Sequence, residues 1–467
     1  MLPPRPIPRH SRWQFDSPPK LLHAAIAMWL FSLSILIAVV VPPFQSPDEF
    51  DHLTRAYLFS KGQIVLIAPD GKASGGFIDT GLARYMDAYS NLPFQPAQKL
   101  NSENIALAKQ ITWTGLTEFR SAPGMAYYFP AIYLIHGLGL RAGETIGLSV
   151  ADSYYLTRII LLITICIIIF YAFCLVPPNY LTVALLLMPM SLFQFASASL
   201  DGIATALSIL LISIYLKCRQ DRSTFNTKLL VLGLLIWILL AASRLQTFPM
   251  ALLLLAESWA HRRHKYLLML MVSALGIIGW QLLTLSTTVD GRVALGATSQ
   301  QIIYYYVTQP DELFAVFWRT FTNIDVLKGY FSSFIGLLGW LDTPFPGSEY
   351  KYIFFALLTI AVISINTSEL KKYWPIRLLM LSSAAGMLFI VFFSVLVTWT
   401  PHPAGVIEGV VGRYFLIPGI LIAYALTALY PAQSTFKQNG VIWLSVWLFG
   451  TLTTAITLNL LLYRYFL

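Results

Sequence analysis

Charged side chains are scarce in this sequence: Asp, Glu, Lys and Arg make up only 11% of its 467 residues. A soluble globular domain has about a quarter of its residues in these four types. Hydrophobic residues instead account for 57%, and apolar runs near the length that crosses a bilayer, about 20 residues, recur from residue 21 onward. The scarcity of charge therefore excludes a soluble domain and indicates an all-α, polytopic membrane protein.

Cysteine is also rare, with only Cys166, Cys174 and Cys218 in the chain. The sequence has no CxxC pair and no Cys/His spacing, so it supports neither a disulfide framework nor a zinc site. It also lacks an internal repeat, a low-complexity linker and a second soluble domain. We therefore expect a single transmembrane domain over residues 21–467, preceded by a cytoplasmic tail over residues 1–20.

The formal net charge of +9 would suggest a nucleic-acid partner in a soluble protein. No basic segment with interleaved aromatic residues is present, however, so we expect no nucleic acid. Lys and Arg gather instead in short loops, which the positive-inside rule places in the cytoplasm. The clusters are Arg5, Arg9, Arg12 and Lys20; Lys217, Arg219, Arg222 and Lys228; His261 to Lys265; and Lys371, Lys372 and Arg377.

The apolar runs predict about eleven transmembrane helices. They cover residues 21–41, 153–175, 180–198, 203–217, 229–243, 247–260, 266–284, 351–366, 376–398, 412–430 and 440–463. A further short apolar segment, 125–140, would turn the later basic loops outward if it crossed the membrane, so we predict that it lies flat at the interface. The N-terminus is then cytoplasmic, the C-terminus is outside, and the long outer loops are 44–152 and 285–350.

An acidic motif, PDEFDH, directly follows the first span and contains Asp48, Glu49, Asp51 and His52. Pro47 suits the first turn of a helix, which would place the first two acids near its positive N-terminus. One interpretation is a solvated helix cap, a position that favours Asp. The other is a functional cluster, because charges crowded against a span are costly unless they are paired or used. We favour the functional interpretation.

Further candidate residues lie on the same predicted outer face. Asp201 is followed by glycine, so it either forms a turn or joins the acidic cluster. Arg244 and Arg413 either extend their charges to water or bind a lipid phosphate through the guanidinium fork. Trp340 and Asp342 lie in an outer loop, where the tryptophan is an interface anchor or a ligand contact. We expect Asp48, Asp201 and Arg413 to converge on one cavity, and we favour Arg413 over Arg244 as the phosphate ligand.

The order of these motifs resembles the GT-C superfamily of membrane glycosyltransferases, which use polyprenyl-phosphate-linked sugars. PDEFDH stands where that superfamily has its first-loop acidic motif, and SAPGMAYYFPAIYLI stands where it has its second interfacial helix. The chain also resembles a bacterial family of predicted membrane proteins that is classed as a domain of unknown function. That likeness lies in SPDEFDH, MPMSLFQFASASLDG, IGLLGWLD and GRYFLIP, over roughly residues 20–430.

The resemblance implies a GT-C-like fold with interfacial helices in a large first outer loop. It also implies transfer of a sugar from a polyprenyl-phosphate donor to a glycan or glycolipid acceptor, next to membrane lipid, on the periplasmic face of the bacterial inner membrane. Asp48 would be the base, with Glu49, Asp51 and His52 beside it. In the superfamily this carboxylate alternatively helps to bind a divalent cation, Mg²⁺ or Mn²⁺, and Asp201 would be its partner. Only one acid stands at that second position.

Two other functions fit a membrane protein with large outer loops. A glycolipid transporter or flippase would have charged or broken helices near the middle of the bilayer and an inverted repeat. A surface-polysaccharide polymerase or ligase would join longer glycans instead of single sugars. We favour the transferase because the acidic motif follows the first span directly.

Overall fold

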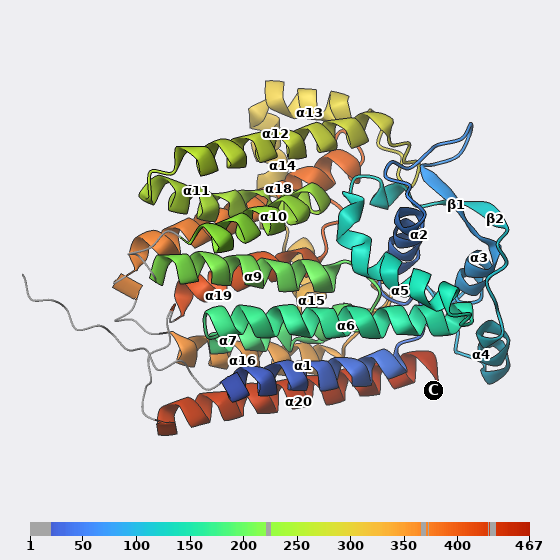
Figure 1. The fold of residues 1–467 in the computed structure, drawn as a ribbon, viewed down its shortest axis with the longest axis horizontal. Coiled ribbons are helices and arrows are strands. Elements are labelled where there is room, and N and C mark those ends of the chain that lie inside the picture. The colour runs from blue at the N-terminus through green and yellow to red at the C-terminus, as the bar shows by residue number, and fades with distance from the viewer. Residues whose placement is uncertain (1–19, 221–225, 366–369, 372, 428, 430–435) are drawn as a thin grey trace, which may run out of the picture.

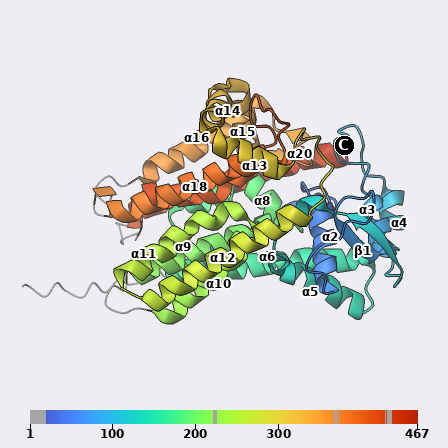
Figure 2. The ribbon, with the colours of Figure 1, turned by 90° about the horizontal axis from the view of Figure 1, so that it is seen from above.

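The computed structural model describes residues 20–220, 226–365, 370–371, 373–427, 429 and 436–467. Its long helices run side by side, and the segment 44–149 lies at one end of them (Figures 1 and 2). The helices of this bundle are α1 (Lys20–Val40), α6 (Val150–Leu175), α9 (Asp201–Gln220), α10 (Thr227–Ser243), α11 (Ala251–Ala260), α12 (His264–Thr287), α16 (Gly347–Ser364), α18 (Trp374–Thr398), α19 (Leu416–Leu426) and α20 (Phe436–Tyr465).

Seven helices within the described ranges are long and apolar enough to cross a membrane. They are α1, α6, α9, α12, α16, α18 and the part of α20 from Gly440 to Tyr465. The apolar helices Thr227–Ser243 and Gly412–Leu426 are shorter. The prediction of a helical multi-pass membrane protein is confirmed, whereas the finer count of about eleven spans stays a prediction.

The prediction of a single helix over residues 180–198 is wrong. The segment contains two short helices, α7 (Tyr180–Leu186) and α8 (Pro189–Phe195), and Met188 between them has an extended ψ of 150°. Pro189 explains the break, because proline lacks an N–H group and disfavours a helical residue before it. The predicted helix 247–260 is likewise divided, into the 3-10 helix η3 (Leu245–Met250) and α11.

The segment 44–149 folds into its own small layer at the end of the bundle. Its elements are α2 (Glu49–Ser60), β1 (Gly75–Asp79), α3 (Thr80–Asp87), α4 (Ser102–Lys109), β2 (Thr117–Ser121), η1 (Pro123–Met125), η2 (Pro130–Tyr133) and α5 (Leu134–Thr145). Strand β1 pairs antiparallel with β2, which the sequence analysis did not predict. Helix α5 has 12 residues, so it reaches only about 18 Å, less than the roughly 30 Å of a bilayer core. The segment 125–140 therefore forms no spanning helix, as predicted.

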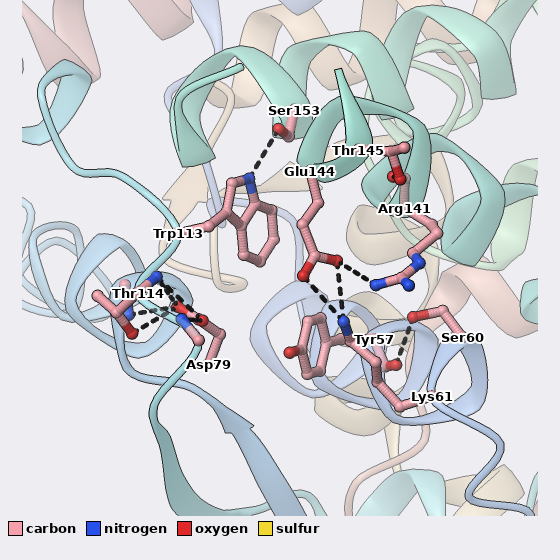
Figure 3. A network of polar contacts seen from close by, with 12 residues as sticks. Tyr57, Ser60, Lys61, Asp79, Trp113, Thr114, Arg141, Glu144, Thr145 and Ser153 are labelled. Carbon is pink, nitrogen blue, oxygen red and sulfur yellow. Dashed lines mark hydrogen bonds and ion pairs between the residues drawn. The ribbon is translucent and has the colours of Figure 1, made fainter. Parts of the chain in front are cut away.

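Polar contacts hold this segment together and fasten it to α6. Lys61, which follows α2, pairs with Glu144 of α5 at 2.9 Å (Figure 3). Trp113 donates a hydrogen bond from Nε1 to Ser153 Oγ of α6 at 3.1 Å (Figure 3). Helix α5 in turn packs along α6. Helix α2 is therefore fixed relative to the bundle, and so is Asp48, which directly precedes α2.

The predicted outer loop 285–350 is also folded. It contains α13 (Ser299–Thr308), α14 (Pro310–Thr322), α15 (Ile324–Gly336) and the short paired strands β3 (Leu337–Leu338) and β4 (Thr343–Pro344). Helix α15 packs against the 3-10 helix η4 (Gly412–Phe415), which leads into α19. The loop therefore contacts the turn that contains Arg413.

The candidate acids and the basic loops lie at opposite ends of the helices. Asp201 begins α9, whereas Lys217 and Arg219 lie in its last turn. Lys228 lies at the start of α10, whereas Arg244 follows its last residue. This separation is the one that the positive-inside prediction requires. Arg5, Arg9, Arg12, Arg222 and Lys372 lie outside the described residues.

Candidate functional site

Asp48 occupies the N-cap position of α2 but does not cap it. Its backbone is left-handed, with φ 63°, and its side chain makes no capping hydrogen bond. This conformation is unfavourable for a residue with a side chain. The carboxylate instead forms an ion pair with Arg413, whose guanidinium also donates to the Pro47 carbonyl at 3.2 Å. The helix-cap interpretation therefore does not hold for Asp48.

A second ion pair joins Asp201 to Arg244. Arg413 connects the two pairs, because its Nε lies 3.9 Å from Asp201 Oδ2. The arginine side chains are only 4% and 5% exposed, so their charges do not extend into bulk water. Buried charges of this kind need partners. The three residues expected to converge, Asp48, Asp201 and Arg413, thus form one chain of alternating charge together with Arg244.

These charges border a cavity of about 540 Å³. Asp48, Arg244, Arg413 and Trp340 line it directly, whereas Asp201 lines a smaller neighbouring cavity with the same arginines. An aliphatic wall, defined by Leu282 and Leu285 of α12 and Val391 and Val395 of α18, lies on the same cavity. Since Leu282 is 61% exposed, this wall continues onto the outer surface of the bundle.

Glu49 is fully buried and does not line the cavity. Its Oε1 accepts hydrogen bonds from Tyr154 Oη and the Ala198 N–H, both at 2.7 Å, and its Oε2 accepts from the Ser46 N–H at 3.2 Å. Glu49 therefore fastens the start of α2 to α6 and to the non-helical link that precedes Asp201. Its position suits a structural role.

The other two members of the predicted catalytic cluster, Asp51 and His52, also lie outside the cavity lining. Burial lowers the pKa of His52 to about 3, so this imidazole is neutral near pH 7. Its Nδ1 lies 2.7 Å from Tyr133 Oη, and its ring stacks on Tyr128, which does line the cavity. Burial, followed by the neighbouring charge of Asp48, raises the pKa of Asp51 to about 7.

Trp340 and Asp342 differ in their positions. The Trp340 ring lines the cavity, and its Nε1 donates to the Phe44 carbonyl at 2.8 Å. Asp342 is outside the lining and pairs with Arg464 at 3.1 Å, while its Oδ2 accepts from the Phe94 N–H at 2.9 Å. Asp342 is thus a residue that positions the cavity wall, and the structure gives it no place on the cavity surface.

Sequence reasoning missed Arg292, which also lines the cavity. Its guanidinium pairs with Asp290 at 2.7 Å and lies 5.0 Å from the Trp399 ring centroid. The signal was the motif DGR directly after an apolar run, the same kind of position as that of Arg244. Three arginines from separate segments of the chain therefore line one cavity.

A family model matches residues 31–423 of the chain, and its description is predicted membrane protein, DUF2142. The chain belongs to this family. The matched range begins within α1 and ends within α19, so it contains every cavity residue from Asp48 to Arg413. No curated protein and no solved structure matches the chain. The DUF2142 description states no activity, so the function must be argued from the geometry.

A divalent cation does not fit the donor set of this DUF2142 protein. Asp48 and Asp201, the acids that would bind it, are each paired with an arginine. Among the residues that the structure describes, no group of three His, Cys, Asp or Glu side chains is arranged to bind a metal ion. Mg²⁺ prefers several oxygen ligands, and guanidinium groups supply none. The chemistry proposed below therefore uses Arg charges.

Proposed function

We propose that this DUF2142 protein is a GT-C-type glycosyltransferase. It would move a sugar from a polyprenyl-phosphate donor to a glycan or glycolipid acceptor on the periplasmic face of the bacterial inner membrane. The observation that carries the proposal is one cavity in which the Asp48–Arg413 pair and the aliphatic wall lie together. A lipid-linked phosphosugar has this combination of an apolar tail and an anionic head.

The donor would be bound through both of its parts. The isoprenoid tail packs on the aliphatic wall, which is open to lipid at Leu282. The phosphate lies among Arg244, Arg292 and Arg413, because guanidinium groups form paired, charge-assisted hydrogen bonds with phosphate oxygens. Arg413 Nε and Arg244 Nε are buried and make no hydrogen bond within the described residues, and Arg413 Nε lies 3.9 Å from Asp201 Oδ2.

The reaction would be a single displacement at the anomeric carbon. An acceptor hydroxyl oxygen forms a bond to the anomeric carbon while the bond between that carbon and the phosphate oxygen breaks. The polyprenyl phosphate leaves with the electron pair. Asp48 takes the hydroxyl proton, and the arginines stabilise the phosphate charge. Burial, the largest single influence, would raise the pKa of Asp48, but Arg413 and smaller contributions from the other neighbours together outweigh burial and lower it, so Asp48 is ionised at neutral pH. The configuration of the sugar inverts.

A glycolipid transporter is the second candidate, since the break between α7 and α8 is a feature of transporter helices. The charged residues argue against it. They gather where α9 begins and α10 ends, away from the middle of the helices. A transporter binding site is typically near the bilayer midplane.

The test uses the full chain in lipid vesicles, supplied with radiolabelled undecaprenyl-phosphate hexoses and a cell-envelope glycolipid extract. Asp48→Asn should lower the transfer rate by a factor of about 10² to 10⁴, the usual contribution of a general base. Asp70→Asn, an exposed acid in the same 44–149 segment, is the matched control and should leave the rate unchanged.

The products distinguish the alternatives. One added sugar per acceptor supports the transferase, and added repeat units support a polymerase or ligase. Label that accumulates inside the vesicles without a new covalent bond supports the transporter. Unchanged transfer by the Asp48→Asn protein would remove Asp48 from the mechanism.

A further inference from the structure

Two aromatic residues from separate outer loops, Phe94 and Trp340, line the cavity that contains Asp48. Their rings meet edge to face, with centroids 5.7 Å apart. Trp340 also contacts Phe50 of α2, at 5.8 Å between centroids. The Phe94 ring is 63% exposed, so burial of the ring does not explain its position.

Polar contacts beneath the cavity surface determine where Phe94 lies. Its φ is 60°, a left-handed value that is strained for an aromatic residue and persists only when the surroundings impose it. The Phe94 N–H donates to Asp342 at 2.9 Å, and Asp342 pairs with Arg464. Arg464 also donates to the Leu92 and Gln98 carbonyls at 2.8 and 3.1 Å, on either side of Phe94 in the chain. A buried ion pair therefore fixes the loop that presents this ring.

The Trp340 ring is fixed in a similar way. Its Nε1 donates to the Phe44 carbonyl, so its polar atom is used inside the protein. A tryptophan that anchors a protein at the membrane interface instead directs this group toward the headgroup region. The contacts of Trp340 therefore favour a role within the cavity over a role as an anchor.

The cavity surface has two kinds of apolar area. The aliphatic wall comes from α12 and α18, whereas Phe94 and Trp340 come from loops that follow α3 and β3. Aliphatic side chains suit an isoprenoid tail. Aromatic faces suit a pyranose ring, because the sugar's C–H face is apolar and carries slight positive charge toward the negative face of the aromatic ring.

We propose that Phe94 and Trp340 form the binding platform for the acceptor sugar, which stacks on the exposed Phe94 ring and directs one hydroxyl toward Asp48. The ligand class is a neutral pyranoside. The platform rests on the proposed glycosyltransferase function and adds to it the place of the second substrate. Asp342 and Arg464 act as positioning residues, since they contact the loop and not the sugar.

The experiment measures sugar binding without any donor. The full chain in lipid nanodiscs is titrated with methyl glycosides of glucose, galactose, mannose and N-acetylglucosamine, and binding is followed by saturation-transfer NMR. Wild type should saturate the ring C–H protons of at least one glycoside. Phe94→Ala should weaken that binding about tenfold, as expected for loss of an aromatic stacking partner. Phe94→Tyr keeps the ring face and should bind like wild type.

Phe77 on β1 supplies the matched control, because it is 51% exposed and lies outside the cavity lining. Phe77→Ala should bind the glycosides like wild type. Thermal stabilisation by undecaprenyl phosphate reports the donor side of the cavity, and Phe94→Ala should leave it unchanged. Unaltered glycoside binding by Phe94→Ala, or no binding of any glycoside by wild type, would overturn the platform.

Different experimental results would contradict the sugar platform and the proposed glycosyltransferase function. Glycoside binding that depends on Phe94, without transfer from any donor, would leave the platform standing and remove the transferase. Sugar transfer with the same acceptor KM in Phe94→Ala and wild type would leave the transferase standing and remove the platform.

Discussion

Arg413 lies 365 positions after Asp48 in the chain, and the two side chains form an ion pair. The pair joins the end of the first span and its acidic motif to the turn before α19. It also places the proposed base beside a cation that can exchange the carboxylate for a donor phosphate. If Arg413 bound the donor phosphate as proposed, its effect on the Asp48 pKa would weaken, and Asp48 would become a stronger base. The same pair therefore connects the fold with the proposed reaction.

Arg413→Gln should destabilise the protein more than the double variant Asp48→Asn/Arg413→Gln. The single change leaves Asp48 without its cation in a site where Arg413 is only 5% exposed. Removing one partner of a buried pair costs about 3–5 kcal/mol, whereas replacing both costs less. Thermal unfolding in nanodiscs measures the difference. Arg120→Gln breaks an exposed pair with Asp87 and should cost at most about 1 kcal/mol. Equal destabilisation by the single and double variants would show that the pair is not coupled.

Glu49→Gln should lower stability by about 1–3 kcal/mol, because a neutral amide cannot accept from Tyr154, Ala198 and Ser46 as the carboxylate does. It should also reduce transfer, since α2 and the link before Asp201 lose their common support. The measurements are the unfolding midpoint and the transfer rate. Glu118→Gln, at an exposed position on β2, is the control and should change neither. A fully stable but inactive Glu49→Gln protein would instead indicate a direct role in catalysis.

The multi-pass helical fold could be predicted from the sequence because long apolar runs and basic loops follow directly from the properties of a bilayer. The convergence of Asp48, Asp201 and Arg413 was expected, because each lies at the same end of a predicted span, whereas Arg244 was not among the residues expected to converge. The separate roles within PDEFDH were not predictable. Glu49 and Asp48 are neighbours in sequence, yet Asp48, with its left-handed backbone, pairs with Arg413, whereas Glu49 accepts hydrogen bonds from Tyr154 and Ala198.

The loop that contains Arg292 was missed for a related reason. Arg292 lies in a loop, where arginine is usually solvated, and its contact with Trp399 joins positions more than a hundred residues apart. The break at Met188 was missed because hydropathy averages over Pro189. Phe94 had no signal at all, since its position depends on Asp342 and Arg464 from distant segments.

Asp51 should make the protein less stable as the pH rises from about 4 to about 7. Its pKa is raised to about 7 in the folded chain by burial and by Asp48, against about 3.9 when unfolded. Between these values the folded state binds one proton more than the unfolded state, so stability falls with rising pH and levels off above about 7. Asp51→Asn cannot ionise and should flatten this decline.

The measurement is the unfolding midpoint of wild type and Asp51→Asn at several pH values. The two proteins should agree near pH 4, and the variant should be the more stable one at pH 8. Asp70→Asn, at an exposed position, controls for general charge effects. If the difference in unfolding midpoint between wild type and Asp51→Asn stayed constant from pH 4 to pH 8, this role for Asp51 would be ruled out.

The proposed periplasmic site requires that the two ends of the bundle face opposite sides of the membrane. In a background with Cys166, Cys174 and Cys218 replaced by Ala, Ile64→Cys marks the segment 44–149 and Arg262→Cys marks the basic loop between α11 and α12. Ile64 is 52% exposed, so a thiol there is accessible. A membrane-impermeant maleimide should label Ile64→Cys in intact spheroplasts and Arg262→Cys only after permeabilisation, because the positive-inside rule retains the basic loops in the cytoplasm. The reverse pattern would place Asp48 in the cytosol, where the acceptors of the proposed reaction are absent, and the transferase proposal would fail with it.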